Sequence, residues 1–390
     1  MLNNKFYLPQ KSVVQARIVL QQSLFLIVAI AITGCQTSAP ISQSPSPEAS
    51  SREDTQLVLN NAILEQSNKR ENTVWKIKAN NIFYSEDRKT ATLDRVVGNL
   101  LQNGKIILKV SAKEGEVRDN GNIIILKEQI VASDPRNGSV MESNLLEWRP
   151  QENLLLIKEN LTGTHPNLEV TAQKGKYFTD IERLEIEGNV VATTEKPSSQ
   201  LRSDRLVWDV ASDVITSPGA VEIVRFAEND NITDELKSDR ATVNLATNTA
   251  TLNNNIELVS LQPKIQAATE SLVWNYQQRI GKTDKPIQII NRDRQITLTG
   301  NKGEFDLQQQ IAKLTNGVRG INQAKASNLY ARQLIWKIAT EEVEATGNII
   351  YEQVNPKARL TGEKAVGTLN DNNIVVTSDS KKQVTSIIEK

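Results

Sequence analysis

Cysteine and histidine are nearly absent from this 390-residue chain, which contains one of each. With a single cysteine, no disulfide can form within the chain, and a zinc site built from Cys and His is excluded. His165 lies in the turn-like stretch Thr164-His165-Pro166-Asn167. A lone histidine in a loop is more often solvated than catalytic. The sequence therefore predicts no metal site and no histidine-based catalysis.

An excess of positive charge is also missing, because 46 Lys and Arg residues balance 46 Asp and Glu residues. A nucleic-acid-binding surface needs a basic excess, so the chain is not expected to bind nucleic acid. Gly98, Gly188 and Gly347 are single glycines and form no phosphate-binding loop. Acidic residues such as Glu341-Glu342 lie in polar turns, as on a solvated face. We therefore expect no catalytic residues, no cofactor and no enzyme.

Amphipathic helical patterns are missing as well. No window holds apolar residues at i, i+3, i+4 and i+7 over three turns, while β-branched residues, Asn, Gly and Thr are abundant. Aromatic residues make up only 4% of the chain, but they recur at regular intervals. These features predict an all-β fold with almost no helix.

One pattern recurs along most of the chain, about ten times. An apolar residue is followed two places on by a small residue. An aliphatic residue or glycine then follows at +3, and most often an aromatic at +5, counted from the small residue. A fixed period indicates one supersecondary unit stacked on itself. The small residues are Ala79, Ala112, Ser143, Ala172, Ser203, Ser238, Thr269, Gly300, Ala331 and Gly362.

The spacing within each unit predicts its secondary structure. Positions −2 and 0, and positions +3 and +5, alternate as in a strand, whereas the step from 0 to +3 breaks the alternation as a β-bulge does. A polar break and a second alternating run at +12, +14 and +18 follow. We therefore predict an elongated antiparallel β-jellyroll of about ten two-strand units. A right-handed β-helix is the alternative, although its coils usually carry three strands.

The N-terminal residues differ from the repeats. Lys5, Lys11 and Arg17 precede a short apolar stretch that ends in Ile-Thr-Gly-Cys at Cys35, which resembles the lipobox of bacterial lipoproteins. An uncleaved signal anchor is the alternative. Residues 1–35 are thus predicted as signal peptide or membrane anchor, 36–55 as a flexible linker, 56–380 as the repeated jellyroll, and 381–390 as a tail.

The repeats resemble a known family. The opening segments, residues 57–61 (Leu-Val-Leu-Asn-Asn) and 74–79 (Val-Trp-x-Ile-x-Ala), resemble the start of the lipopolysaccharide-export protein LptC. Residues 187–190 (Glu-Gly-Asn-Val) and 346–349 (Thr-Gly-Asn-Ile) resemble OstA-type repeats, which LptC, the bridge protein LptA and the amino-terminal domain of LptD share. The resemblance covers roughly residues 57–376. Two departures are the greater length of this chain and the lipobox.

The resemblance implies a component of lipopolysaccharide transport on the periplasmic side of the bacterial inner membrane, anchored at its N-terminus. It would receive lipopolysaccharide from an inner-membrane ABC transporter and pass it along an apolar groove towards the outer membrane. An LptA-like or LptD-like jellyroll would be its partner through edge-strand pairing. The alternatives are an LptA-like bridge, a general envelope scaffold or carbohydrate-binding protein with a filled interior, and a β-helix hydrolase.

The residues expected to line the groove are large apolar residues at +3 and +5 of the units. They share one strand phase, which places them on one face. They are Leu146, Trp148, Tyr177, Leu206, Trp208, Leu272, Trp274, Phe305, Leu334 and Trp336.

Cys35 is predicted to carry the membrane anchor, because two acyl chains give stable attachment where one chain is marginal. Cys35→Ser is expected to leave an unprocessed precursor that takes up no fatty-acid label in cells. Normal processing and normal labelling of this variant would show that the lipobox interpretation is wrong.

Overall fold

The chain divides into two units, Met1–Glu53 and Asp54–Lys390. The computed structural model describes residues 57–68, 73–136, 138–165, 168–195, 198–261, 264–368, 374–378 and 384–389, all in the second unit. Cys35, the predicted signal peptide or anchor and the whole predicted linker lie outside the described residues. Within the described residues, no helix has both the length and the apolar character needed to cross a bilayer.

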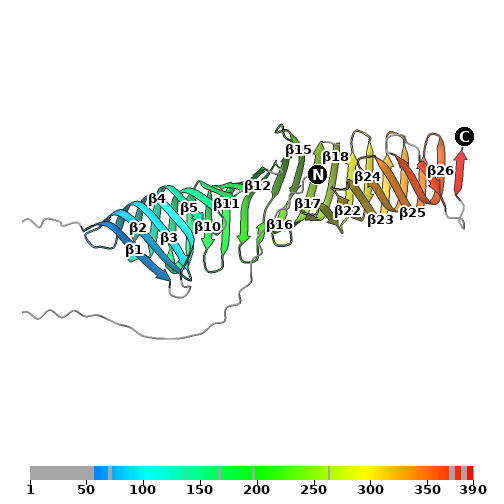
Figure 1. Ribbon diagram of the computed structural model, residues 1–390. Helices are drawn as coiled ribbons and strands as arrows, with labels where there is room; N and C mark the ends of the chain where they lie inside the picture. Colours follow the sequence, from blue (N-terminus) through cyan, green and yellow to red (C-terminus); the bar gives the residue numbers. More distant parts are fainter. Residues whose placement is uncertain are drawn as a thin grey trace, which may run out of the picture. The chain divides into compact units, whose positions relative to one another are not determined.

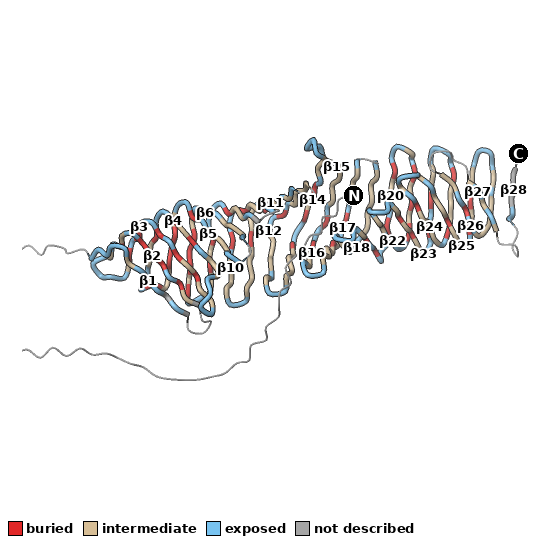
Figure 2. The backbone as a smooth tube through the Cα atoms, in the orientation of Figure 1, coloured by how far each residue is buried: buried red, intermediate tan, exposed pale blue. Residues whose placement is uncertain are grey.

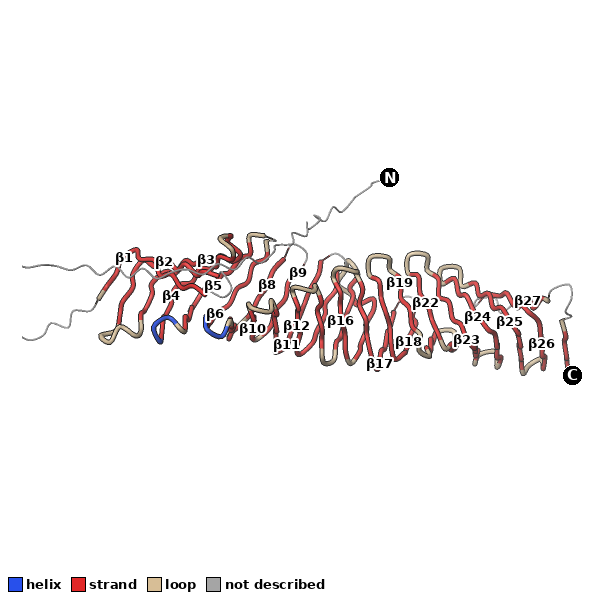
Figure 3. Tube along the Cα trace, turned by 90° about the horizontal axis from the view of Figure 1, so that it is seen from below, coloured by secondary structure: helices blue, strands red, loops and turns tan. Residues whose placement is uncertain are grey.

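The described residues of the second unit form almost entirely β-strands, and the regular non-strand elements among them are two short 3₁₀ turns (Figures 1 and 3). In chain order the elements are β1 (Val58–Asn68), β2 (Thr73–Tyr84), β3 (Ala91–Gln102), β4 (Lys105–Arg118), η1 (Asp119–Gly121), β5 (Ile123–Asp134), β6 (Ser139–Arg149), η2 (Pro150–Glu152), β7 (Leu154–Glu159), β8 (Leu161–His165), β9 (Leu168–Ala172), β10 (Lys174–Phe178), β11 (Arg183–Glu195), β12 (Ser198–Asp209), β13 (Val214–Ser217), β14 (Val221–Phe226), β15 (Ile232–Ser238), β16 (Arg240–Asn244), β17 (Thr249–Leu261), β18 (Lys264–Asn275), β19 (Ile280–Thr283), β20 (Ile287–Asn291), β21 (Ile296–Gly300), β22 (Lys302–Asp306), β23 (Ile311–Asn322), β24 (Ser327–Lys337), β25 (Glu342–Gln353), β26 (Lys357–Thr368), β27 (Ile374–Thr377) and β28 (Thr385–Glu389).

Every strand pair that joins neighbouring passes is antiparallel, from β1 with β2 to β26 with β27 and β28. The predicted elongated antiparallel jellyroll is therefore confirmed, and the β-helix, whose coils pair in parallel, is not what the chain forms. Some passes run as one long strand, such as β11, while others split in two, such as β7 and β8. The last strand, β28, lies within the range 381–390 that the sequence predicts as a tail. Its residues extend the sheet by pairing with β26.

Each pass changes direction at the predicted bulge. The register shifts at Ser111/Glu114 and Tyr330/Gln333, on either side of the small residues Ala112 and Ala331. The strand segments on one side of this step pair with one another and form one part of the sheet, called the first wall. The segments on the other side pair likewise and form the other part, called the second wall. The first wall contains β7, β10, β13, β16, β19, β22 and β27, and the second wall contains β8, β9, β14, β15, β20, β21 and β28. Long strands contribute one half to each wall, so the walls meet along the bulge edge.

The free edge of the first wall is formed by stacked turns. In the turns of units 3 to 9, the residue at +10 has a left-handed backbone, with φ of 55° at both Asn248 and Gln310. Its carbonyl accepts a hydrogen bond from the backbone N–H at +7 of the next unit. Tyr276 N–H donates to Asn248 at 3.1 Å, and Ile338 N–H donates to Gln310 at 2.8 Å. Successive units are thus joined at their turns as well as through their strands.

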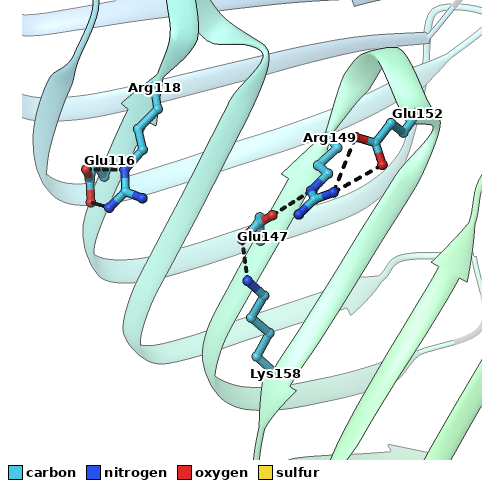
Figure 4. Close-up of polar contacts among 6 residues, drawn as sticks. All are labelled: Glu116, Arg118, Glu147, Arg149, Glu152 and Lys158. Carbon is cyan, nitrogen blue, oxygen red and sulfur yellow. Dashed lines mark hydrogen bonds and ion pairs between the residues drawn. The ribbon is translucent and has the colours of Figure 1, made fainter.

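The outer face of the first wall carries cross-strand ion pairs (Figure 4). Lys127 Nζ lies 2.8 Å from Glu116 Oε2, and Arg118 also donates to Glu116. Hydrogen bonds from Arg118 and then Lys127 lower the pKa of Glu116 to about 2. Glu147 repeats this arrangement one unit later, between Arg149 and Lys158. The outward face is therefore charged, whereas the inward face is apolar.

Candidate functional site

The candidate site is the interior between the two walls. On the first wall, strand register places each residue at +5 opposite the residue at +12, and this continues from pass to pass. The resulting row contains only apolar residues and glycine. It consists of Tyr84, Ala91, Val117, Ile124, Trp148, Leu155, Tyr177, Leu184, Trp208, Ile215, Val243, Ala250, Trp274, Gly281, Phe305, Ala312, Trp336, Val343, Gly367 and Ile374.

A second row on the first wall contains the residues at +3 and +14, such as Leu146 paired with Leu126 and Leu334 paired with Leu314. All ten residues expected to line a groove therefore lie on these two rows of the first wall. Residues paired opposite each other in an antiparallel sheet share a face, so the ten residues point to the same side.

The second wall supplies a facing row that the expected groove residues did not include. It contains the residues at −2 and the residues paired opposite them on the adjacent strands. The position was visible in the repeat, as the apolar residue that opens each unit. The row includes Leu64, Ile77, Val110, Met141, Val170, Leu201, Ile223, Leu236, Leu258, Ala267, Ile289, Leu298, Leu329, Tyr351 and Leu360.

The two walls pack directly against each other at the N-terminal end. Trp75 of the second wall and Trp148 of the first wall have ring centroids 5.8 Å apart. Both are buried in one apolar cluster that extends from Trp75 to Leu155. A second cluster, from Ile287 to Ala365, fills the interior near the C-terminal end. Buried apolar clusters therefore occupy the interior at both ends (Figure 2).

The central section, residues 198–261 and 264–275, is different. Equivalent +3 residues are almost completely buried at the ends, with 2% of Leu146 and 1% of Leu334 exposed. In the central section Leu206 and Leu272 are only half-buried, and so are Trp208, Trp274 and the facing Leu236. The fully buried cluster there is small and consists of Val221, Ala241, Leu252 and Ile256. These lie next to the bulge edge, so the interior of the central section is open away from that edge.

Four indole N–H groups have no protein acceptor within the described residues, namely those of Trp75, Trp148, Trp208 and Trp336. Indole N–H groups usually find an acceptor when they are buried. Trp148, Trp208 and Trp336 lie on an inward row of the first wall, and Trp75 faces Trp148 from the second wall. The interior is therefore apolar and contains a few buried hydrogen-bond donors, among them the Trp208 indole N–H in the central section.

A cavity lies between the walls near the C-terminal end, with a volume of about 90 Å³. Its lining is mostly apolar and comes from both walls, with Asn322 and Lys325 at its lip. The apolar lining includes Leu298, Leu329, Tyr351, Leu334, Val343 and Ala345.

Charged side chains from the turns reach across the free edges of the walls. Arg294, in a second-wall turn, donates to Glu341 of a first-wall turn, at 2.9 Å from Nη2 to Oε1. The sequence placed Glu341 on a solvated face, but only 26% of its side chain is exposed. Near the other end, burial and then the negative charge of Glu182 raise the pKa of Tyr177, while Arg136 opposes them.

Comparison with known proteins identifies the family to which the sequence belongs. The sequence model described as "Lipopolysaccharide-assembly, LptC-related" matches residues 24–155, 141–227 and 222–323, so its matches cover well over half of the chain. No curated protein matches the sequence. Among solved structures, the WD40 domain of SCAP from fission yeast is matched at 9% identity over 87% of this chain and 91% of that one. The TM-score is 0.13, so this match carries no argument.

Proposed function

Because this chain belongs to the LptC-related family of lipopolysaccharide-assembly proteins, we propose that it is a passive carrier in lipopolysaccharide transport. Its apolar interior would hold acyl chains while the saccharide part stays in water. The family membership supports the role in transport. The path within the molecule is inferred from the geometry of the walls.

The observation that carries the proposal is that the apolar lining of the central section is partly exposed. Partial exposure of apolar side chains to water costs free energy. In this section the partly exposed side chains of the first wall include those of Leu206, Trp208, Leu272 and Trp274. An acyl chain can cover this surface. Full burial of a twelve-carbon chain would stabilise the complex by about 10 kcal/mol, at about 0.8 kcal/mol per CH₂. A partly open section gains less, so the lipid can also leave.

The Trp208 indole N–H supports the same ligand chemistry. Acyl chains of a glycolipid are attached through carbonyl groups, which accept hydrogen bonds. A donor without a protein acceptor beside an apolar, half-open surface suits such a group. A carbohydrate-binding scaffold would instead need polar groups that converge on sugar hydroxyls, and the inward rows contain few of them.

Direction and location follow from the family proposal. We infer that the chain works on the periplasmic side of the bacterial inner membrane, anchored through its N-terminal residues. It would take lipopolysaccharide from an inner-membrane ABC transporter, which supplies the work, and pass it towards the outer membrane. Its length also suits an LptA-like bridge, which is the second candidate function.

The first test is photo-crosslinking in cells. A photo-reactive amino acid at Trp208 or Trp274 is expected to capture lipopolysaccharide, because both side chains face the open interior. The matched controls are Val207 and Val273, which are the immediate neighbours on the outward face. Immunoblotting with an antibody against lipopolysaccharide detects the product. Capture at Val207 and Val273 in place of Trp208 and Trp274 would contradict the proposed path.

The second test concerns the partner jellyroll. β27 pairs on one side with β26, and Val375 is 62% exposed. An unpaired strand edge can pair with another chain, and proline interrupts such a ladder because it lacks a donor. Val375→Pro is expected to abolish capture of an LptA-like or LptD-like jellyroll in a pull-down.

The matched control is Val375→Thr, which keeps a β-branched residue and the backbone donor, and should bind like the unchanged chain. Circular dichroism checks that both variants keep their strands. Undiminished binding by a folded Val375→Pro variant would refute edge pairing at this end.

A further inference from the structure

One ion pair joins the free edges of the two walls. Arg294 lies in the turn between β20 and β21 of the second wall, and Glu341 lies in the turn between β24 and β25 of the first wall. Arg294 Nη2 is 2.9 Å from Glu341 Oε1 and 2.8 Å from Oε2. Because the walls are joined at the bulge edge, their turns border the mouth of the interior. This pair therefore bridges the mouth.

The bridge joins two turns that lead into strands lining the cavity between the walls. Ile296 follows Arg294 by two residues, and Val343 follows Glu341 by two residues. Ile296 and Val343 both line the cavity of about 90 Å³. The ion pair therefore lies at the mouth beside the strands that form this cavity.

The cavity suits an apolar guest. Most of its lining is apolar, so water inside it finds few hydrogen-bond partners. The walls around it come from the two inward rows, which continue from the open central section. A segment of an acyl chain suits this space, because the lining is mostly apolar and the inward rows run along the length of the jellyroll.

Both charged residues are presented by ordered turns. The Arg294 N–H donates to Asn291 Oδ1 at 3.1 Å, and the Ile338 N–H at the start of the other turn donates to Gln310 at 2.8 Å. The side chains of Arg294 and Glu341 remain 33% and 26% exposed. Each can therefore turn to water without leaving a buried charge, so the pair can open at modest cost.

A related arrangement occurs towards the N-terminal end. Arg136 lies in the second-wall turn between β5 and β6, and Glu182 lies in the first-wall turn between β10 and β11. A hydrogen bond to Asp134, and after it the negative charges of Asp134, Tyr177 and Glu182, raise the pKa of Arg136, while burial lowers it. Oppositely charged turns thus face each other on both sides of the open central section.

We propose that Arg294 and Glu341 form a gate over the C-terminal part of the interior, which admits an acyl chain from the central section when the ion pair opens. The proposal rests on the proposed function and adds a second compartment to it. The path is then divided into an open section that holds lipid and a gated section through which lipid passes.

The test uses the full chain in detergent with Cys35→Ser, so that an introduced cysteine is the only thiol. Val343→Cys reports on the gated cavity, and Ile215→Cys, on the same inward row, reports on the central section. The rate of labelling by N-ethylmaleimide is measured for each. Arg294→Glu places two carboxylates together. We expect it to raise the labelling rate at Val343→Cys about five-fold, as for loss of a contact of modest strength, and to leave Ile215→Cys unchanged.

Two variants control for charge and for folding. Arg292→Glu makes the same charge change in the same turn, but Arg292 donates to Gln266 on its own wall at 2.7 Å and does not cross the mouth. It should leave the rate at Val343→Cys unchanged. Arg294→Glu combined with Glu341→Arg restores opposite charges and should return the slow rate. Equal labelling in all of these backgrounds, or no rescue by the double exchange, would overturn the gate.

Added lipopolysaccharide separates the gate from the proposed function. The function predicts that lipopolysaccharide slows labelling of Ile215→Cys in every background, whereas de-acylated lipopolysaccharide does not. The gate predicts that it slows labelling of Val343→Cys in the Arg294→Glu background and much less with Arg294 present. No effect at Ile215→Cys contradicts the function, whereas equal slowing at Val343→Cys with and without Arg294 contradicts the gate.

Discussion

The structure depends on one constraint: each wall of the jellyroll has an apolar face that can be removed from water only by the other wall. The three-residue step after each small residue satisfies this constraint, because it turns every strand from one wall to the other while keeping both inward faces apolar. Stacked units then extend the two faces together, through strand pairing and through hydrogen bonds between successive turns. Where the walls pack together, as at Trp75 and Trp148, the interior is a core. Where they do not, it is a groove.

The contrast between closely packed ends and an open central section explains how the protein can carry a lipid. The packed ends stabilise the fold, and the central section keeps apolar residues such as Leu206 and Trp274 available to a ligand. A carrier must release what it holds, so a shallow open section serves transport better than a deep pocket that would bind an acyl chain with its full burial energy. Membership of the LptC-related family supplies the nature of the cargo. The ion pair between Arg294 and Glu341 adds a point at which passage can be controlled.

Much of this architecture could be predicted from local pattern. The alternation of Leu206 and Trp208 fixes which face they share, and the spacing of Ala331 and Leu334 fixes the bulge. Their burial could not be predicted, because Leu206 and Leu334 occupy the same position in the repeat and differ only in how closely the opposite wall approaches. The contact of Arg294 with Glu341 was missed for the same reason. The two residues lie on different walls, in turns that meet only through the tilt of the strands.

The central claim, that the walls bury their apolar residues at the ends and leave them partly exposed in the middle, is tested most directly by comparing Leu334→Ala with Leu206→Ala in urea unfolding. Both substitutions remove the same atoms from the same repeat position. The account predicts that Leu334→Ala lowers the free energy of unfolding by about 2–5 kcal/mol, as in a packed core. Leu206→Ala should lower it by less than Leu334→Ala does, since part of the Leu206 side chain is already in contact with water. Equal losses for the two variants would show a core that is filled throughout, and would contradict the account.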